Sequence, residues 1–224
     1  PIGSRGLGDV YKRQLNEYGF TGKGEIPTVD EEADIYQALE LDWIAPELRE
    51  NRGEIEAACA AELPDLVKLS QLKGTFHNHT IASDGENTLE EMASAAQNHG
   101  LQYLGIADHS KSSFQANGLN EERLTQQIEE IKIINAKFED FALLSGSEVD
   151  ILKDGSLDFH DDLLAELDYC VASIHNVFNL PEKEMTDRLI RAMENEYVTM
   201  LGHVTGRLLL KRDPYPLNME KIID

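Results

Sequence analysis

After residue 74, the sequence alternates between short apolar runs typical of strands and longer amphipathic runs typical of helices, and this alternation restricts the possible folds. Repeated strand–helix units predict a parallel sheet, because each helix returns the chain to the start of the next strand. Five strands are predicted, at residues 75–79, 103–107, 143–149, 168–174 and 198–201. Helices are predicted at residues 87–99, 120–138, 161–166 and 182–195, and from residue 218 onward.

The predicted helix at residues 87–99 has the clearest end signals. Thr88 and Glu91 can form a capping box at its start, and Gly100 is placed to end it. The predicted helix at 120–138 carries one apolar stripe, which indicates a face packed on the sheet and consists of Leu124, Ile128, Ile131 and Ile134.

The first part of the chain has a different character. Residues 1–14 show no amphipathic period and are interpreted as a non-native leader outside the fold. Residues 15–73 are polar and acidic, which is typical of a connecting region. Within it we expect a short helix at 30–39, a turn near 46–49 and a second helix at 55–61.

Every predicted strand delivers a residue of metal-binding type at its C-terminal end. His77 and His79 end the first strand and, being two residues apart, are expected to point the same way, ~6.6 Å apart. In a parallel barrel these strand ends converge on one face, where active sites are built. The full predicted set, with one residue from the loop after the first strand, is His77, His79, Asp84, His109, Glu148, His175 and His203.

The residue types in this set indicate the chemistry. Imidazole and carboxylate groups suit Zn, Mn or Fe, and the set contains no thiolate. A carboxylate such as Glu148 can bridge two cations, so a cluster of this size predicts two or three divalent metals. Such centres clamp a phosphoryl group and lower the pKa of a bound water to ~7. The sequence has no Gly-x-Ser-x-Gly motif that would favour a nucleophilic serine instead.

Composition limits the possible partners and the compartment. With 42 acidic and 20 basic residues the net charge is −22, which repels nucleic acid at long range. A role on DNA would therefore depend on bound metals, a local basic patch or a further domain. No apolar run approaches the ~20 residues of a membrane span, and no secretory signal is present, so we expect a cytoplasmic bacterial protein. Cys59 and Cys170 are interpreted as buried, reduced thiols.

The runs around the metal-type residues resemble the PHP (polymerase and histidinol phosphatase) family. They are Gly74–Thr80 with Ser83-Asp84-Gly85, Asp108-His109-Ser110, Gly146–Asp150, Ala172–His175 and Gly202-His203. The resemblance implies an α/β fold, a distorted seven-stranded (β/α)7 TIM-like barrel that is incomplete here, with about five strands, and that follows an N-terminal helical linker. The family usually has Asp where Thr75 stands, and commonly Pro where Val204 stands, but neither departure removes a ligand.

Segments outside those runs are similar to one branch of the family. Residues 44–55 and 205–215 resemble bacterial family X DNA polymerases, and residues 15–19 resemble the last strand region of that polymerase. The resemblance implies that residues 15–73 are the end of a polymerase domain and a linker, and that 74–224 are a PHP domain. It also implies a polymerase domain in cis and, beyond the last residue, two closing strands with an Asp-x-His pair.

The same resemblance implies an activity and residue roles. The implied activity is Mn-dependent 3'-5' exonuclease or 3'-end phosphoesterase action on DNA, in DNA repair. All seven residues of the predicted set match metal ligands, with Glu148 as the bridge. Glu148, His109 and Asp108 are the expected catalytic residues, and Arg207 is expected to contact a substrate phosphate. Asp108 could orient His109 or a ligand water, or could instead cap the backbone.

Two other functions stay open from the sequence. A small-molecule phosphatase acting on histidinol phosphate or a nucleotide would use the same ligands. A non-catalytic module could use the metals for stability or for positioning DNA beside a polymerase. His99 and His160, which lie outside the strand ends, are interpreted as structural and solvated, respectively.

Overall fold

The computed structural model describes residues 13–16, 19–22, 28–208 and 210–224. It divides into two compact units, Pro1–Val67 and Lys68–Asp224. Most of the expected leader, residues 1–12, lies outside the described residues. No helix in the described part of the chain is long and apolar enough to cross a membrane.

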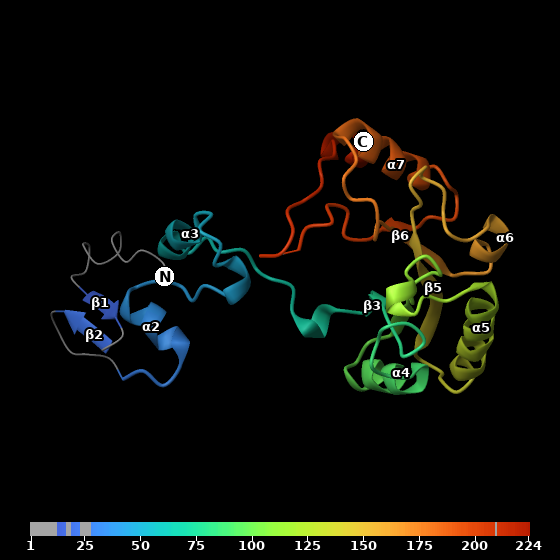
Figure 1. Cartoon of the computed structure of the whole chain (residues 1–224). Helices are drawn as coiled ribbons and strands as arrows, with labels where there is room; N and C mark the ends of the chain where they lie inside the picture. Colours follow the sequence, from blue (N-terminus) through green and yellow to red (C-terminus); the bar gives the residue numbers. More distant parts are fainter. Residues whose placement is uncertain (1–12, 17–18, 23–27, 209) are drawn as a thin grey trace. The chain divides into compact units, whose positions relative to one another are not determined.

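The first unit combines a hairpin with short helices (Figure 1). Strand β1, Arg13–Asn16, pairs antiparallel with β2, Gly19–Gly22. Helix α2, Glu32–Ala38, the 3-10 turn η1, Pro46–Leu48, and helix α3, Glu54–Ala60, follow. The predicted helical character of this region is therefore confirmed, and the strands lie in and beside residues 15–19, which resemble a strand region. The pairing of β1 with β2 places Arg13 and Gln14 in the sheet, so the expectation that all of residues 1–14 lie outside the fold is wrong for these two residues.

The two cysteines differ in burial. Cys59 is exposed, so the prediction that it is a buried thiol is wrong: it lies on the outward side of α3, next to the buried Ala58. Cys170 is fully buried, as predicted, and burial raises the pKa of its thiol to about 12. Neither cysteine belongs to a possible metal site among the described residues.

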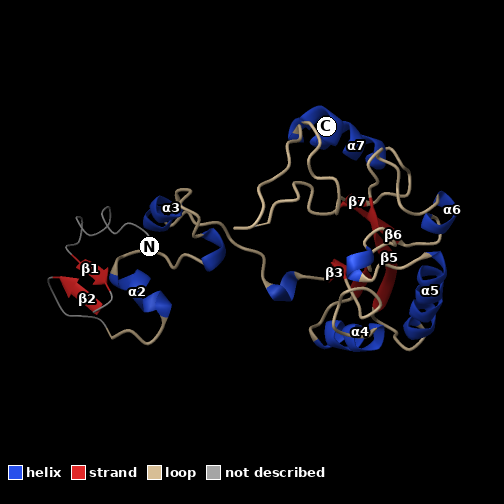
Figure 2. Cartoon of the chain, viewed as in Figure 1, coloured by secondary structure: helices blue, strands red, loops and turns tan. Residues whose placement is uncertain are grey.

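The second unit contains one parallel sheet whose strand order follows the sequence (Figure 2). The curled sheet confirms the predicted α/β class and the incomplete barrel, and helices lie around one side of it. Its five strands are β3 (Gly74–Asn78), β4 (Tyr103–Ile106), β5 (Ala142–Asp150), β6 (Tyr169–Ser173) and β7 (Met200–Leu201).

The helices of the second unit form where the apolar periodicity predicts them. The Thr88 side chain accepts a hydrogen bond from the Glu91 amide, and the Glu91 carboxylate accepts one from the Thr88 amide, which confirms the predicted capping box. Gly100 follows with φ of +79°, the left-handed conformation that ends a helix. The helical elements are η2 (Leu69–Gln71), α4 (Leu89–Asn98), η3 (Phe114–Ala116), α5 (Glu121–Asn135), α6 (Asp161–Leu164), α7 (Glu182–Met193) and α8 (Met219–Ile223).

Side chains pack on both faces of the sheet and hold its strands in position. On the helix side, Ile131 and Ile134 of α5 pack with α4 and with Leu104, Ile106 and Leu143 of the sheet. Leu124 and Ile128 of the same helix pack with Val149 and Cys170. On the other side, Tyr169 occupies space that two glycines leave open. A Cβ on Gly105 would lie 2.6 Å from the Tyr169 hydroxyl, and one on Gly146 would lie 2.4 Å from the ring. The Tyr169 hydroxyl donates to the Ile106 carbonyl at 2.8 Å, which ties β6 to β4.

We expect Gly146→Ala to lower the free energy of unfolding by about 1–3 kcal/mol, because the added methyl group forces the buried Tyr169 ring to move. Chemical denaturation of the wild type and the variant measures this cost. Tyr169→Leu removes the ring, so the double variant Gly146→Ala/Tyr169→Leu should cost less than the sum of the single variants. Strictly additive costs would contradict the steric explanation.

Candidate metal centre

The predicted metal-type residues come together at the C-terminal edge of the parallel strands. Glu148 lies in β5, His77 in β3, and the others follow the ends of strands. Three groups of side chains offer ligand atoms that lie within 4.8 Å of one another. The groups are His77–His79–Glu148, His79–Asp84–His109 and His109–Glu148–His175.

Glu148 is the centre of the cluster. Its side chain is 1% exposed, and three imidazole nitrogens surround its Oε1: His77 Nε2 at 3.0 Å, His175 Nε2 at 3.2 Å and His203 Nε2 at 2.8 Å. Its Oε2 lies 3.0 Å from His109 Nδ1 and 3.6 Å from His79 Nε2. A carboxylate with donors on both oxygens is suited to bridging two cations.

The environment of Glu148 keeps it ionised. Burial raises the pKa of its carboxyl, but hydrogen bonds from His109, His175 and His203 outweigh burial and hold that pKa well below its ordinary value. The negative charge that cations require is therefore present at neutral pH. For His79 the balance differs: burial and the neighbouring His109 lower its pKa, which favours the neutral imidazole that binds metal.

The two histidines in and just after β3 reach the centre through an irregularity in the strand's backbone. The register between β3 and β4 shifts between Thr75 and Asn78, and His77 has φ of +62°, which is uncommon for a residue other than glycine. The rings of His77 and His79 still face the same centre, with centroids 5.3 Å apart. They thus lie on one side, as predicted, but the bulge re-aims His77 and plain strand alternation does not explain the arrangement.

Asp84 completes a second group beside Glu148. Its carboxylate oxygens lie 3.4 Å from His79 Nδ1 and 3.5 Å from His109 Nε2, and the two rings are 4.5 Å apart. His79 Nδ1 is buried without a hydrogen-bond partner. A buried nitrogen without a partner is costly unless something else satisfies it, and a cation bound to this imidazole would do so. The donor set therefore fits divalent metals.

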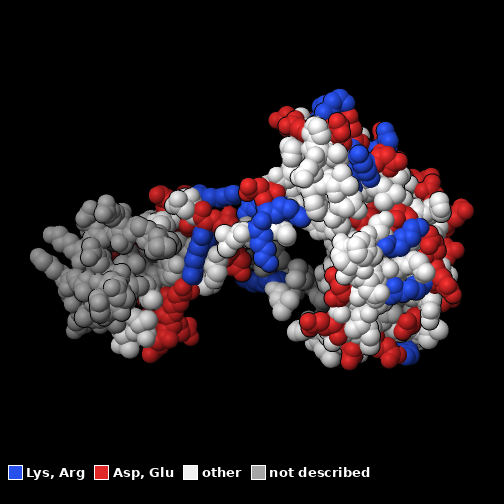
Figure 3. All heavy atoms as spheres, in the orientation of Figure 1, with Lys and Arg blue, Asp and Glu red and all other residues white. Residues whose placement is uncertain are grey.

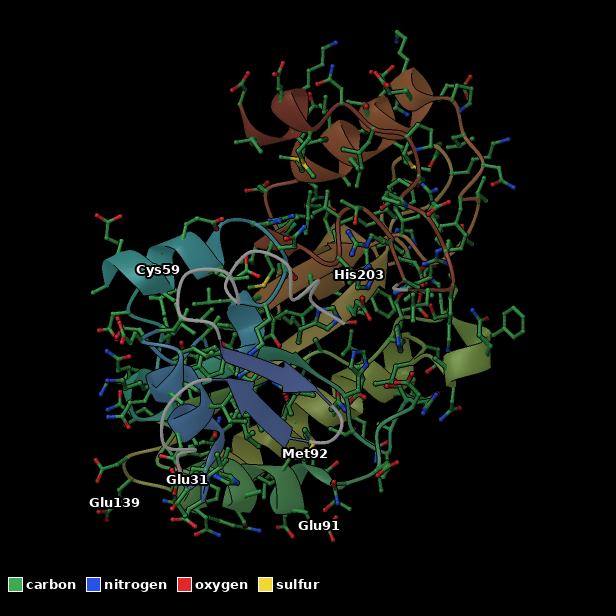
Figure 4. All side chains as sticks on the ribbon, turned by 90° about the vertical axis from the view of Figure 1, so that its left-hand side faces the viewer. Glu31, Cys59, Glu91, Met92, Glu139 and His203 are labelled. Atoms are coloured by element: carbon green, nitrogen blue, oxygen red, sulfur yellow. The ribbon has the colours of Figure 1, made fainter. Side chains whose placement is uncertain are left out.

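His203 enters the centre from the segment after β7 (Figure 4). Its backbone φ of +28° is unfavourable for any residue other than glycine. Its imidazole is 46% exposed, which is more than that of any other histidine that contacts Glu148. The preceding Gly202 makes the approach possible, since a Cβ there would lie 2.2 Å from Ser173 Oγ and 3.1 Å from His77 Cε1. A glycine is required where backbone and ligand meet this closely.

A buried acid orients His175. Asp150 is fully buried, its Oδ1 lies 3.1 Å from His175 Nδ1, and its Oδ2 accepts a 2.6 Å hydrogen bond from Ser113 Oγ. Burial lowers the pKa of His175, but the hydrogen bonds to Asp150 and Glu148 outweigh it and raise the pKa to about 9. Carboxylates that hold a ligand histidine in this way fix its tautomer. Sequence reasoning gave no role to Ser113, because a serine in a polar loop carries no signal.

The remaining predicted residues lie outside the cluster. Asp108 is fully buried behind it and accepts hydrogen bonds from Thr80, Ser83 and Gln127. Arg207 is exposed after β7, and its phosphate contact stays a prediction. The two histidines interpreted as structural or solvated, His99 and His160, are exposed and belong to none of the three groups.

The surface of the second unit matches the acidic composition. On the face of the second unit seen in Figure 3, Asp and Glu side chains lie mainly around the margin of a largely uncharged surface, with Lys and Arg side chains among them. Several lysines of the unit are paired with acidic residues, as Lys111 is with Glu121 and Lys183 with Asp187. Attraction of a polyanion to the unit would therefore depend on cations held in the cluster.

Comparison with known proteins gives two family matches. The model of the PHP domain matches residues 75–222, and the model of the DNA polymerase beta thumb matches residues 10–50. The chain is 43% identical over 213 residues to the DNA polymerase/3'-5' exonuclease PolX of Bacillus subtilis, which covers 94% of this chain and 37% of that protein.

Shorter matches extend to proteins described as probable phosphatases. One from Thermoanaerobacter sp. is 31% identical over 152 residues, and one from Clostridium botulinum is 34% identical over 151 residues. Each match covers 66% of this chain and 57% of the relative. The chain thus spans less than two thirds of the length of these relatives.

In metal-free protein, we expect Asp150→Asn to lower the pKa of His175 by about one unit or more, because the variant removes the larger of its two stabilising partners. NMR titration of the imidazole measures the midpoint. A raised pKa stabilises the fold below pH ~6.5, and that contribution is lost as pH rises through about 9, so the variant should lose stability chiefly at the lower pH. Asp158→Asn, which removes a carboxylate bonded to Ser112, is the matched control. An unchanged His175 midpoint in Asp150→Asn would refute the assignment.

Proposed function

Because the chain belongs to the PHP domain family, we propose that it is a metal-dependent phosphoesterase that hydrolyses phosphoester bonds at DNA 3' ends, as a 3'-5' exonuclease or a 3'-phosphatase. The observation that carries the proposal is the convergence of five imidazoles on the buried Glu148. The family match and the 43% identity to an exonuclease support the substrate class.

The proposed ligands divide by position in the cluster. Glu148 would bridge the ions, and His77, His79, His109, His175 and His203 would contribute one imidazole each, while Asp84 would join His79 and His109. Two or three Mn, Zn or Fe ions would polarise the phosphoryl group and lower the pKa of the attacking water to ~7. Imidazole and carboxylate donors without thiolate suit all three metals.

The chain's own residues supply binding, orientation and charge. Glu148 and Asp84 would neutralise part of the positive charge of the cations, which would limit how tightly a phosphate is held. Asp150 keeps His175 in one tautomer. Arg207, exposed after β7 and four residues beyond His203, is proposed to contact a substrate phosphate.

The proposed context is a larger polymerase. The thumb match at residues 10–50 supports the interpretation of residues 15–73 as the end of a polymerase domain and a linker, with residues 74–224 as the PHP domain. A polymerase site in cis would deliver 3' ends to the metal centre, which suits DNA repair in the bacterial cytoplasm. Of residues 1–14, residues 10–14 lie within the thumb match and Arg13 and Gln14 belong to β1, so the proposed leader is confined to residues 1–9.

A second candidate is favoured by a specific observation. The matches to the probable phosphatases cover 66% of this chain. The same metal-type residues could bind and hydrolyse a small phosphate ester equally well. The substrate would then be a small molecule such as histidinol phosphate or a nucleotide. A third outcome is a module that binds metal and DNA without turnover.

We expect Mn-dependent shortening of a 5'-labelled oligonucleotide by the full chain, and a loss of ~10³-fold or more in Glu148→Ala, since several kcal/mol of transition-state stabilisation depend on the cations. Gel analysis with Mn²⁺ and with EDTA measures this. Glu129→Ala, which removes an exposed carboxylate paired with Lys132, should keep full activity. Turnover of histidinol phosphate but not DNA would replace the proposal with the phosphatase. Metal binding without turnover of either DNA or histidinol phosphate would favour the third function, a non-catalytic module.

A further inference from the structure

The turn that carries Asp84 has no regular secondary structure to fix it. It follows β3, and the Asp84 side chain is 49% exposed, in contrast to the buried Glu148. Both Asp84 oxygens nevertheless lie within 3.5 Å of an imidazole nitrogen, one from His79 and one from His109. An exposed ligand on a loop keeps such geometry only where other contacts hold its backbone.

Thr80 is the hub of that turn. Its carbonyl accepts hydrogen bonds from the amides of Ser83 at 3.1 Å and Gly85 at 2.8 Å, and its hydroxyl accepts one from the Ala82 amide at 3.0 Å. Thr80 is 1% exposed. Gly85 is needed at the end of the turn, because a Cβ there would lie 2.3 Å from the His79 carbonyl oxygen. Whatever holds Thr80 therefore holds Asp84.

Asp108, two residues after the end of β4, is the group that holds Thr80. Its Oδ1 accepts from the Thr80 amide at 2.7 Å and from Ser83 Oγ at 2.5 Å. Its Oδ2 accepts from Thr80 Oγ1 at 2.7 Å and from Gln127 Nε2 of α5 at 2.6 Å. These four hydrogen bonds use the carboxylate's acceptor sites, and Asp108 belongs to none of the possible metal groups among the described residues.

We propose that Asp108 is a positioning residue for the metal group His79–Asp84–His109, and that it acts by fixing the turn from Thr80 to Gly85. The inference rests on the proposed metal centre and deepens it. Asp108 directly precedes His109, so one carboxylate fixes two of the three ligands: His109 through the chain and Asp84 through Thr80 and Ser83. Outer carboxylates of this kind typically change metal affinity 10–100-fold.

The test measures metal binding by the full chain without any substrate. Asp108→Asn keeps the shape of the side chain, but an amide nitrogen replaces one acceptor, so the four donors cannot all be satisfied. After removal of metal with EDTA, titration with Mn²⁺ and elemental analysis give the number of bound ions and their affinities. We expect one ion to bind 10–100-fold more weakly, while ions held by the other ligands bind as in the wild type.

Two further variants separate positioning from loss of fold. Ser83→Ala removes a single donor to Asp108 and should shift the same ion in the same direction by a smaller factor. Asp168→Asn is the matched control, because Asp168 also accepts from a backbone amide and a hydroxyl, those of Ser145, at 2.8 and 2.9 Å. It lies at the opposite ends of the strands, so its metal binding should equal that of the wild type.

A double variant makes the inference falsifiable. If Asp108 acts largely through Asp84, Asp84→Ala weakens the same ion, and Asp108→Asn/Asp84→Ala weakens it by less than the product of the two single losses. Wild-type affinity in Asp108→Asn, or independent losses that multiply in the double variant, would overturn the inference. A wild-type chain that binds its full set of ions but leaves DNA intact would refute the proposed function and leave this inference standing.

Discussion

Glu148 has a side chain that is 1% exposed, and a carboxylate so far from water is stable only where other groups compensate its charge. Five imidazoles provide that compensation, and each reaches the carboxylate from a different position along the strand ends. The curvature of the sheet, the bulge in β3 and the unusual backbone at His203 all serve this meeting point. Cations bound there would be coordinated by the imidazole nitrogens, which would remove the repulsion among the closely packed histidine rings.

Two buried carboxylates behind the cluster each hold a different part of it in place. Asp150 bonds directly to His175, and Asp108 bonds to the turn that carries Asp84. Neither acid has a lysine or arginine as its hydrogen-bond partner among the described residues, so hydroxyls, amides and imidazole satisfy them instead. Such networks specify one arrangement because a partly satisfied buried carboxylate is costly. The centre is thus held by its surroundings as much as by its ligands.

Much of the fold could be predicted from periodicity and end signals. The stripe of α5 and the capping box of α4 are local patterns, and the helices form where those patterns lie. The short β7, Met200–Leu201, lies within the strand predicted at residues 198–201, whereas the hairpin of the first unit carries too few residues for its pairing to be recognised. The exposure of Cys59 was also missed, because residue type gives only an average burial.

The sequence by itself determined which residues could form a metal centre, because imidazole and carboxylate groups at successive strand ends must converge when parallel strands curl into a barrel. Only the tertiary structure decided how they converge. It made Glu148 the shared neighbour of five histidines, turned His77 inward through a bulge, and gave Ser113, Thr80 and Gln127 their positions behind the ligands. Those contacts join residues far apart in the chain, and their geometry depends on packing that no local pattern encodes.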